Sequence, residues 1–193
     1  MRVRFLGFVL ATAVMGCAAP SEPALPDLGS VPAFSLLDEA GQAVTGDDLQ
    51  GSVWIADFIF TRCAGQCPMM AGRLAQMART LPDVRFVSFT VDPAHDTPER
   101  LAAYARQYGV PAGRWRLLTE AGAGMASIER LARDGFKLAV SPEGTPEEPI
   151  THSVRFALVD RAGHIRGYYD AEDAGAMERL RRDAMRLVRG PRT

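Results

Sequence analysis

The stretch VWIADFIFTRCAGQCP, residues 53–68, determines the fold that we predict for this chain. Its first part, Val53 to Phe60, is a run of β-branched, aromatic and apolar residues with little alternation, which is typical of a strand buried on both faces of an α/β sheet. Cys63 lies just past the end of this strand, and Pro68 after Cys67 suits the first turn of a helix. We therefore expect a cysteine loop between a central strand and a helix, at the sheet edge where α/β proteins usually place their sites.

The rest of the sequence alternates predicted strands with predicted helices, which indicates an α/β layer fold. At the start, a short strand within residues 31–36 and a polar turn leading to Val44 predict a hairpin. After Cys67, apolar residues recur at helical spacing. The other predicted elements are a strand at 84–91, a helix from about 96 to 108 with an Asp or Thr cap, a strand at 115–118, a helix at 126–134, a strand at 136–140, a polar loop at 141–149, a hairpin of strands 154–159 and 164–169, and a helix at 177–188.

Composition indicates one soluble globular domain. Of the 193 residues, 47% are apolar and 23% are charged, close to the averages for such proteins. The 22 basic residues are scattered among 23 acidic ones. The chain thus has no continuous basic field to hold a phosphate backbone, and we expect no nucleic acid as a partner.

The first residues predict export. Two arginines precede an apolar run at residues 5–14 that is too short to span about 30 Å of hydrocarbon, as in a signal peptide. The run ends in VMGC, residues 14–17, which resembles the lipobox of bacterial lipoproteins and implies lipidation of Cys17. The alternative is an ordinary secretory signal cleaved near Ala18; either interpretation places the domain outside the cytoplasm, in the periplasm or on the cell surface. We therefore divide the chain into a signal peptide at 1–16, a lipidated cysteine with a proline-rich tether at 17–29, and a domain at 30–193.

Cys63 and Cys67 are then the two cysteines of the folded domain, and in an oxidising compartment they can form a disulfide with each other. Their position at a helix N-terminus favours the thiolate, which both metal binding and thiol–disulfide exchange require. The alternative is an inert disulfide, although closing so small a loop stabilises a fold little.

Three segments together resemble the Sco/SenC family. Residues 58–68 are similar to its cysteine loop, residues 91–99 to the segment after its next strand, and residues 150–153, Ile-Thr-His-Ser, to its histidine loop. With the predicted hairpin, the likeness spans about residues 30–189. The resemblance implies a thioredoxin-like fold, with a central mixed β-sheet flanked by helices and an N-terminal hairpin.

The same resemblance implies a function. Proteins of this family bind copper through the two cysteines and the histidine, here Cys63, Cys67 and His152, and assist assembly of the dinuclear copper centre of cytochrome c oxidase. The implied partners are the copper-bearing oxidase subunit or another copper or thiol protein, with the membrane reached through the lipid anchor. The chain departs from the family pattern where Ala64 and Gln66 replace a Pro and an acid.

The ligand types agree with copper. Two soft thiolates and one imidazole suit Cu(I) better than a hard cation, and the same set can hold Cu(II) or zinc. We expect His95 and His164 to be solvated surface residues. Asp92, at a strand end before a proline, fits a turn former, and the alternative is a carboxylate close to the metal ligands. Thr151 stands where the family commonly has an Asp before the histidine, so carboxylates that would attract a cation are missing there.

Other functions remain open at this stage. Cys63 and Cys67 would equally serve as the redox pair of a thiol–disulfide oxidoreductase, against which stand their three-residue spacing and the lack of a proline at about Val154-Arg155. A peroxiredoxin-like peroxidase fits less well, because no proline lies upstream in the loop. A non-catalytic domain with a vestigial disulfide is the third alternative. The sequence favours a metallochaperone and leaves enzymatic activity undecided.

Overall fold

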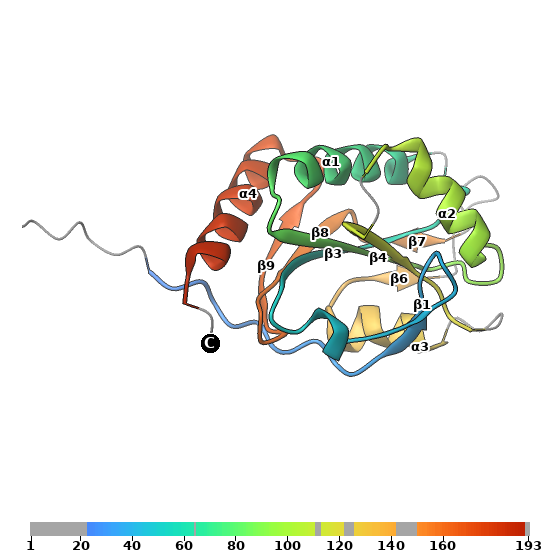
Figure 1. Cartoon of the computed structure of the whole chain (residues 1–193), viewed down its shortest axis with the longest axis horizontal. Helices are drawn as coiled ribbons and strands as arrows, with labels where there is room; N and C mark the ends of the chain where they lie inside the picture. Colours follow the sequence, from blue (N-terminus) through green and yellow to red (C-terminus); the bar gives the residue numbers. More distant parts are fainter. Residues whose placement is uncertain (1–22, 64, 111–112, 122–125, 142–149, 192–193) are drawn as a thin grey trace, which may run out of the picture.

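The computed structural model describes residues 23–191 except 64, 111–112, 122–125 and 142–149. Five of its strands form a mixed sheet in the order β5-β4-β3-β8-β9 (Figure 1). The central strand β3 pairs in parallel with β4 and antiparallel with β8. The strands of this sheet are β3 (Val53–Ile59), β4 (Val84–Thr90), β5 (Trp115–Leu118), β8 (Arg155–Val159) and β9 (Ile165–Asp170).

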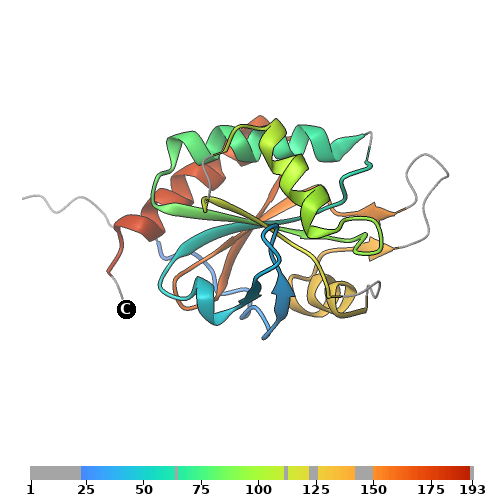
Figure 2. The same cartoon turned by 45° about the vertical axis from the view of Figure 1, so that its right-hand side comes forward.

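Helices cover both faces of the sheet (Figures 1 and 2). One face carries α1 (Gln66–Thr80), α2 (Pro98–Gln107) and α4 (Ala174–Arg189), and the other carries α3 (Ala126–Arg130) with the π-helical turn η2 (Leu131–Gly135). Outside the main sheet lie the hairpin β1 (Ser35–Leu37) and β2 (Ala43–Thr45), the 3-10 turn η1 (Asp47–Leu49), and the antiparallel pair β6 (Val140–Ser141) and β7 (Thr151–His152).

The core is built around β3, all seven of whose residues are buried. On one face of the sheet the Phe58 ring lies 5.2 Å from Phe89 and 5.5 Å from Phe136, between ring centroids. Met70 and Leu74 on α1 are fully buried. Covering both faces of β3 with apolar groups is what its unbroken apolar sequence predicts.

The structure confirms the predicted α/β fold with a central mixed sheet and an N-terminal hairpin. The strand predicted at residues 136–140 is wrong: only Val140 of it belongs to a strand. Instead, the amide of Phe136 donates to Leu131 O and that of Leu138 to Ala132 O, which keeps the chain wrapped on the preceding helical turn. Lys137 has a φ of 52°, outside the extended region. Of the loop predicted at 141–149, Ser141 belongs instead to β6, and residues 142–149 lie outside the described residues.

The first described residues lie along the domain rather than apart from it. Leu28 N donates to Ile165 O at 2.9 Å, and Arg186 Nη2 donates to Pro23 O at 2.6 Å. The division of the chain at residue 30 stays a prediction, and Cys17 and the leader lie outside the described residues. Within the described part, no helix has the length and apolar character needed to cross a membrane.

Candidate metal centre

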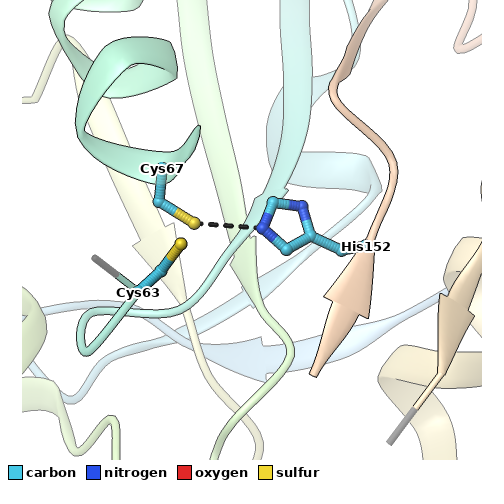
Figure 3. Close-up of side chains that lie close together, drawn as sticks. All are labelled: Cys63, Cys67 and His152. Atoms are coloured by element: carbon cyan, nitrogen blue, oxygen red, sulfur yellow. Dashed lines mark hydrogen bonds between the residues drawn. The ribbon is translucent and has the colours of Figure 1, made fainter. Parts of the chain in front are cut away.

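Cys63, Cys67 and His152 meet at the carboxyl end of β3 (Figure 3). Their three potential ligand atoms all lie within 4.8 Å of one another, and this is the one such group of metal-ligating side chains found among the described residues. Cys67 Sγ lies 3.0 Å from His152 Nε2. The exposed fractions are 8% for Cys63, 0% for Cys67 and 9% for His152, so the site lies just beneath the surface.

Different elements deliver the three side chains. Cys63 sits in the loop after β3, Cys67 in the first turn of α1, and His152 in β7, where it pairs with Val140 of β6. His152 Nδ1 lies 3.2 Å from Ser153 O. The ring of Phe60 contacts the imidazole edge-on, with 5.7 Å between ring centroids. The histidine ring is therefore fixed both by a hydrogen bond and by packing.

The two contacts of the His152 ring fit one tautomer. A carbonyl oxygen only accepts, so the contact with Ser153 O places a hydrogen on Nδ1, and in the neutral tautomer with that hydrogen Nε2 has its lone pair toward Cys67. In that tautomer the Cys67 thiol donates to Nε2. The nitrogen that would bind a metal thus already points at the two sulfur atoms, and the other nitrogen is held by a backbone carbonyl, as in many metal sites.

Burial determines the protonation state of Cys67. Desolvation raises the pKa of this thiol well above its ordinary value, the neighbouring Cys63 raises it further, and a backbone hydrogen bond from Phe60 offsets only part of the shift. This is opposite to the lowering expected from the helix N-terminus, because the loss of hydration outweighs the helix dipole. Without a metal, Cys67 is a neutral thiol at neutral pH.

Two carboxylates from the segment after β4 hold the start of the cysteine loop. Asp96 is fully buried and accepts hydrogen bonds from Thr61 N at 3.0 Å, Thr61 Oγ1 at 2.5 Å and Thr90 Oγ1 at 2.5 Å. Asp92 accepts from Arg62 Nε at 2.6 Å. The two residues before Cys63 are therefore fixed by side chains about 30 positions away in sequence.

Asp92 has the turn-forming role expected of it and a further one. Its backbone oxygen accepts from the amides of His95 and Asp96, while its carboxylate bonds Arg62. Of the two predicted caps, Asp or Thr, the cap position of α2 is Thr97, although its side chain makes no cap bond; Asp96 instead binds the cysteine loop. The two threonines that surround Asp96 in space gave no recognisable signal in the sequence.

A second polar group that the sequence did not indicate lies inside the sheet. Asp57 of β3 is fully buried and accepts a hydrogen bond from Ser88, whose Oγ accepts in turn from Trp115 Nε1 at 2.8 Å. Asp57 Oδ2 has no hydrogen-bond partner among the described residues. Burial raises the pKa of Asp57 to about 7. Nearby, Tyr104 Oη lies 3.5 Å from Cys67 O.

The structure thus brings together the three predicted ligands and leaves the other two histidines elsewhere. His95 Nδ1 lies 2.9 Å from Arg100, and His164 Nδ1 lies 2.7 Å from the Asp27 carboxylate. Ala64 and the side chain of Thr151 lie outside the described residues. Gln66 is exposed, and its Nε2 lies 3.4 Å from a Glu172 oxygen, so it contacts an acid from the β9–α4 connection. Both cysteines are free thiols here, so the disulfide stays a prediction.

Comparison with known proteins agrees with this arrangement. The family model described as SCO1/SenC matches residues 25–188, which include all three ligand-type residues. The chain belongs to the SCO1/SenC family. Its members among known proteins include the SCO1 protein homolog of Bacillus subtilis, which is 36% identical over 137 residues, covering 68% of this chain and 69% of that protein.

Solved structures show the same fold. A SCO1/SenC family lipoprotein from Bacillus anthracis aligns with a TM-score of 0.78 and 30% identity, covering 86% of this chain and 99% of the other. The copper-bound ScoI of Bradyrhizobium japonicum aligns with a TM-score of 0.68 over 82% of this chain and 99% of its own, at 21% identity. A structure of BsSco, a member of the Sco family of cytochrome c oxidase assembly proteins, aligns with a TM-score of 0.73 at 30% identity, covering 86% and 99%.

Proposed function

We propose that this SCO1/SenC protein is an extracytoplasmic copper chaperone that binds copper through Cys63, Cys67 and His152 and assists copper-centre assembly in cytochrome c oxidase. The observation that carries the proposal is the convergence of two sulfur atoms and one imidazole nitrogen within 4.8 Å. Ligands at about 2.0–2.3 Å from one ion lie at most about 4.6 Å apart, so the group fits a single metal ion after small side-chain adjustments.

The donor set supports copper as the cargo. Two thiolates are soft ligands that select Cu(I), and an added imidazole allows Cu(II) as well. The position just beneath the surface supports transfer, because Cys63 at 8% exposure can be reached by ligands of a partner without unfolding of the domain. The copper-bound ScoI structure and the description of BsSco as a member of a family of cytochrome c oxidase assembly proteins support the same cargo and partner for this chain.

Anaerobic titration of the reduced protein against a Cu(I) chelator tests the proposal. Cys63→Ser and Cys67→Ser should each abolish tight Cu(I) binding, because each removes a soft anionic ligand. His152→Ala should leave a weaker two-thiolate Cu(I) site and lose mainly the Cu(II) form, which absorption spectra report. His164→Ala is the matched control and should bind as wild type does. Wild-type copper binding that survives His152→Ala unchanged in both oxidation states would remove His152 from the site.

The second candidate is a thiol–disulfide oxidoreductase that uses Cys63 and Cys67 as its redox pair. The adjacent thiols favour it, as does the disulfide switch described for BsSco. In the reaction, a Cys63 thiolate attacks a partner disulfide, and Cys67 resolves the mixed disulfide, leaving the partner as a dithiol. Reduction of a protein disulfide by a chain that binds no copper would establish this function in place of the chaperone.

The location outside the cytoplasm and the lipid anchor at Cys17 belong to the same proposal. They are supported by the VMGC sequence at residues 14–17 and by the relative named as a lipoprotein. Replacing Cys17 by Ser should release the protein from membranes. Unchanged membrane retention of that variant would contradict the anchor and leave the copper site untouched.

A further inference from the structure

The segment that leads to the proposed anchor enters the domain beside the C-terminal end of α4. Arg186 Nη2 donates to Pro23 O at 2.6 Å, and Arg166 Nη1 donates to Pro26 O at 3.4 Å. In both views of the whole chain this segment and the end of α4 lie at the left (Figures 1 and 2). The point where the chain enters the domain is therefore known.

This entry point lies at the opposite end of the sheet from the metal centre. Trp54, near the start of β3, pairs with Val159 at the end of β8, so the turn at residues 160–163 is at the amino end of β3. Cys63 follows the carboxyl end of the same strand. At about 3.3 Å per residue, the seven residues of β3 separate the two ends by roughly 20 Å.

Arginines gather at the entry end. They are Arg161, Arg166, Arg182, Arg186 and Arg189, and we call them the arginine end of the domain. Among the described residues, the acids in contact with this end are Asp160, which pairs with Arg166 at 3.0 Å, Asp183, which lies 3.7 Å from Arg186, and Asp27, which bonds His164. The chain as a whole has a net charge of −1, so this local excess of positive charge is not a general property of its surface.

Several of these charges are not neutralised by an acid. The guanidinium group of Arg161 donates to the backbone oxygens of Leu187 and Val188 at 2.5 and 2.7 Å, which satisfies its hydrogen bonds without cancelling its charge. The side chain of Arg182 is 55% exposed and shares one carboxylate, that of Asp183, with Arg186, at 3.9 and 3.7 Å, so one acid faces two guanidinium groups. A hollow of about 210 Å³ lined by Arg161, Arg166 and Arg186 opens on the same end.

We propose that the arginine end docks on the anionic headgroups of the membrane to which Cys17 is anchored, so that the metal centre faces away from the bilayer. The inference rests on the proposed lipid anchor. Only six positions separate Cys17 from Pro23, and an extended chain of that length spans at most about 20 Å. The anchor therefore keeps these arginines close to the surface, where guanidinium groups can form paired hydrogen bonds with phosphate oxygens.

Docking has a consequence for delivery of the metal. The sheet then stands between the bilayer and the cysteine loop, and a partner must reach Cys63 and His152 from the side remote from the membrane. A domain that hung freely on its tether would instead present the site in every direction. The two arrangements predict different protection of the same arginines.

Arginine modification by phenylglyoxal distinguishes the docked domain from one that hangs freely on its tether. The processed lipoprotein is reconstituted in vesicles of phosphatidylcholine alone or mixed with phosphatidylglycerol, and modified residues are mapped by mass spectrometry. Docking predicts that Arg182 and Arg189 react about fivefold more slowly on the anionic vesicles. Molar salt should remove this protection, since it shortens the Debye length to about 3 Å. Arg100 and Arg130, which lie on α2 and α3, should react equally on both vesicles.

A pair of matched variants tests the assignment further. Arg182→Gln with Arg189→Gln should make Arg186 react at the same rate on both vesicles, whereas Arg100→Gln with Arg130→Gln should leave the protection of Arg186 intact. Equal reaction of Arg182 and Arg189 on both vesicles, protection that persists in molar salt, or protection of Arg100 instead would overturn the docking. Protection that needs added membrane proteins would assign the face to a protein partner and also overturn it. A separate experiment tests the lipid anchor: membrane retention of the Cys17→Ser protein would contradict the anchor, whatever the arginine protection shows.

Discussion

Replacing Asp57 by Asn should change how the stability of the reduced, metal-free protein depends on pH. Asp57 is fully buried, one of its oxygens accepts from Ser88, and the other has no hydrogen-bond partner among the described residues. Burial raises the pKa of this carboxyl from 3.8 to about 7. Between about pH 4 and pH 7 the folded protein therefore holds a proton that the unfolded chain has lost. The free energy of unfolding must fall as the pH rises through this window.

The size of the effect follows from the shift. A difference of about 3 pKa units at about 1.4 kcal/mol each amounts to roughly 4 kcal/mol once the pH is above 7, and about 3 kcal/mol of this accumulates between pH 5 and pH 8. Asparagine does not titrate. Its buried amide group finds no hydrogen-bond acceptor at the position where Asp57 Oδ2 has no partner, and this costs about 1–3 kcal/mol of stability at every pH. The variant should be near or below wild type in stability at pH 5 and should gain on it by about 3 kcal/mol by pH 8.

Urea unfolding of both proteins from pH 5 to pH 8 measures this difference. Ser88→Ala is the matched control: it removes the hydrogen bond that lowers the pKa of Asp57, so the decline in stability should extend to higher pH. A difference between Asp57→Asn and wild type that stays constant across the range would refute the reasoning. It would mean that the carboxyl is hydrated in solution or ionises at its ordinary pKa.

Three further predictions concern the metal centre. Asp96→Asn should lower the free energy of unfolding by about 2 kcal/mol and weaken Cu(I) binding, because the carboxylate that accepts three hydrogen bonds from Thr61 and Thr90 is lost. Thr61→Val should cause a smaller loss of both stability and Cu(I) affinity. Unchanged Cu(I) affinity in either variant would show that these hydrogen bonds do not support the metal site. Cu(I) binding displaces the proton of the Cys67 thiol, so the apparent Cu(I) affinity should rise about tenfold per pH unit near neutral pH. A Cu(I) affinity that does not depend on pH would contradict the raised pKa of that thiol. In quenched alkylation followed by mass mapping, Cys63 should react faster than Cys67, because 8% of the former and none of the latter is exposed; equal rates would indicate that α1 opens in solution.

The sequence predicted the elements whose patterns match their surroundings. The apolar run of β3 is buried along its whole length, and the strand at 115–118 has the bounds that were expected. Prediction failed at 136–140, where apolar residues also occur but their partners are rings from other strands. Phe136 packs against Trp54 and Phe58, and these contacts are formed without any strand pairing. An apolar pattern specifies burial, and only the rest of the fold specifies whether the buried segment is extended.

The same distinction holds for the site. The three ligand-type residues carry recognisable chemistry and could be selected from the sequence, whereas Asp96 and Asp57 could not. Each of these acids acts through residues remote in sequence: Asp96 through Thr61, and Asp57 through Ser88. An aspartate before a helix reads as a cap, and an aspartate in a strand reads as a break in an apolar run. The role of Asp57 depends on strand register, which pairs it with Ser88, and that of Asp96 depends on how the segment after β4 folds back on the cysteine loop. Both became visible only in the folded chain.

The arrangement of Cys67 and His152 indicates how one site can be unreactive without metal and still bind a soft cation. Burial raises the pKa of the Cys67 thiol, so without metal its proton stays on sulfur and is shared with His152 Nε2 at 3.0 Å. A neutral, shielded thiol is a poor nucleophile, and oxidation is therefore slow at this sulfur. A soft cation that enters beside Cys63 changes this, because its charge stabilises the thiolate that burial had disfavoured and displaces the proton. Copper and the proton then compete for the same sulfur and nitrogen atoms. The desolvation that resists ionisation of the Cys67 thiol also strengthens the metal–thiolate attraction once the ion is bound.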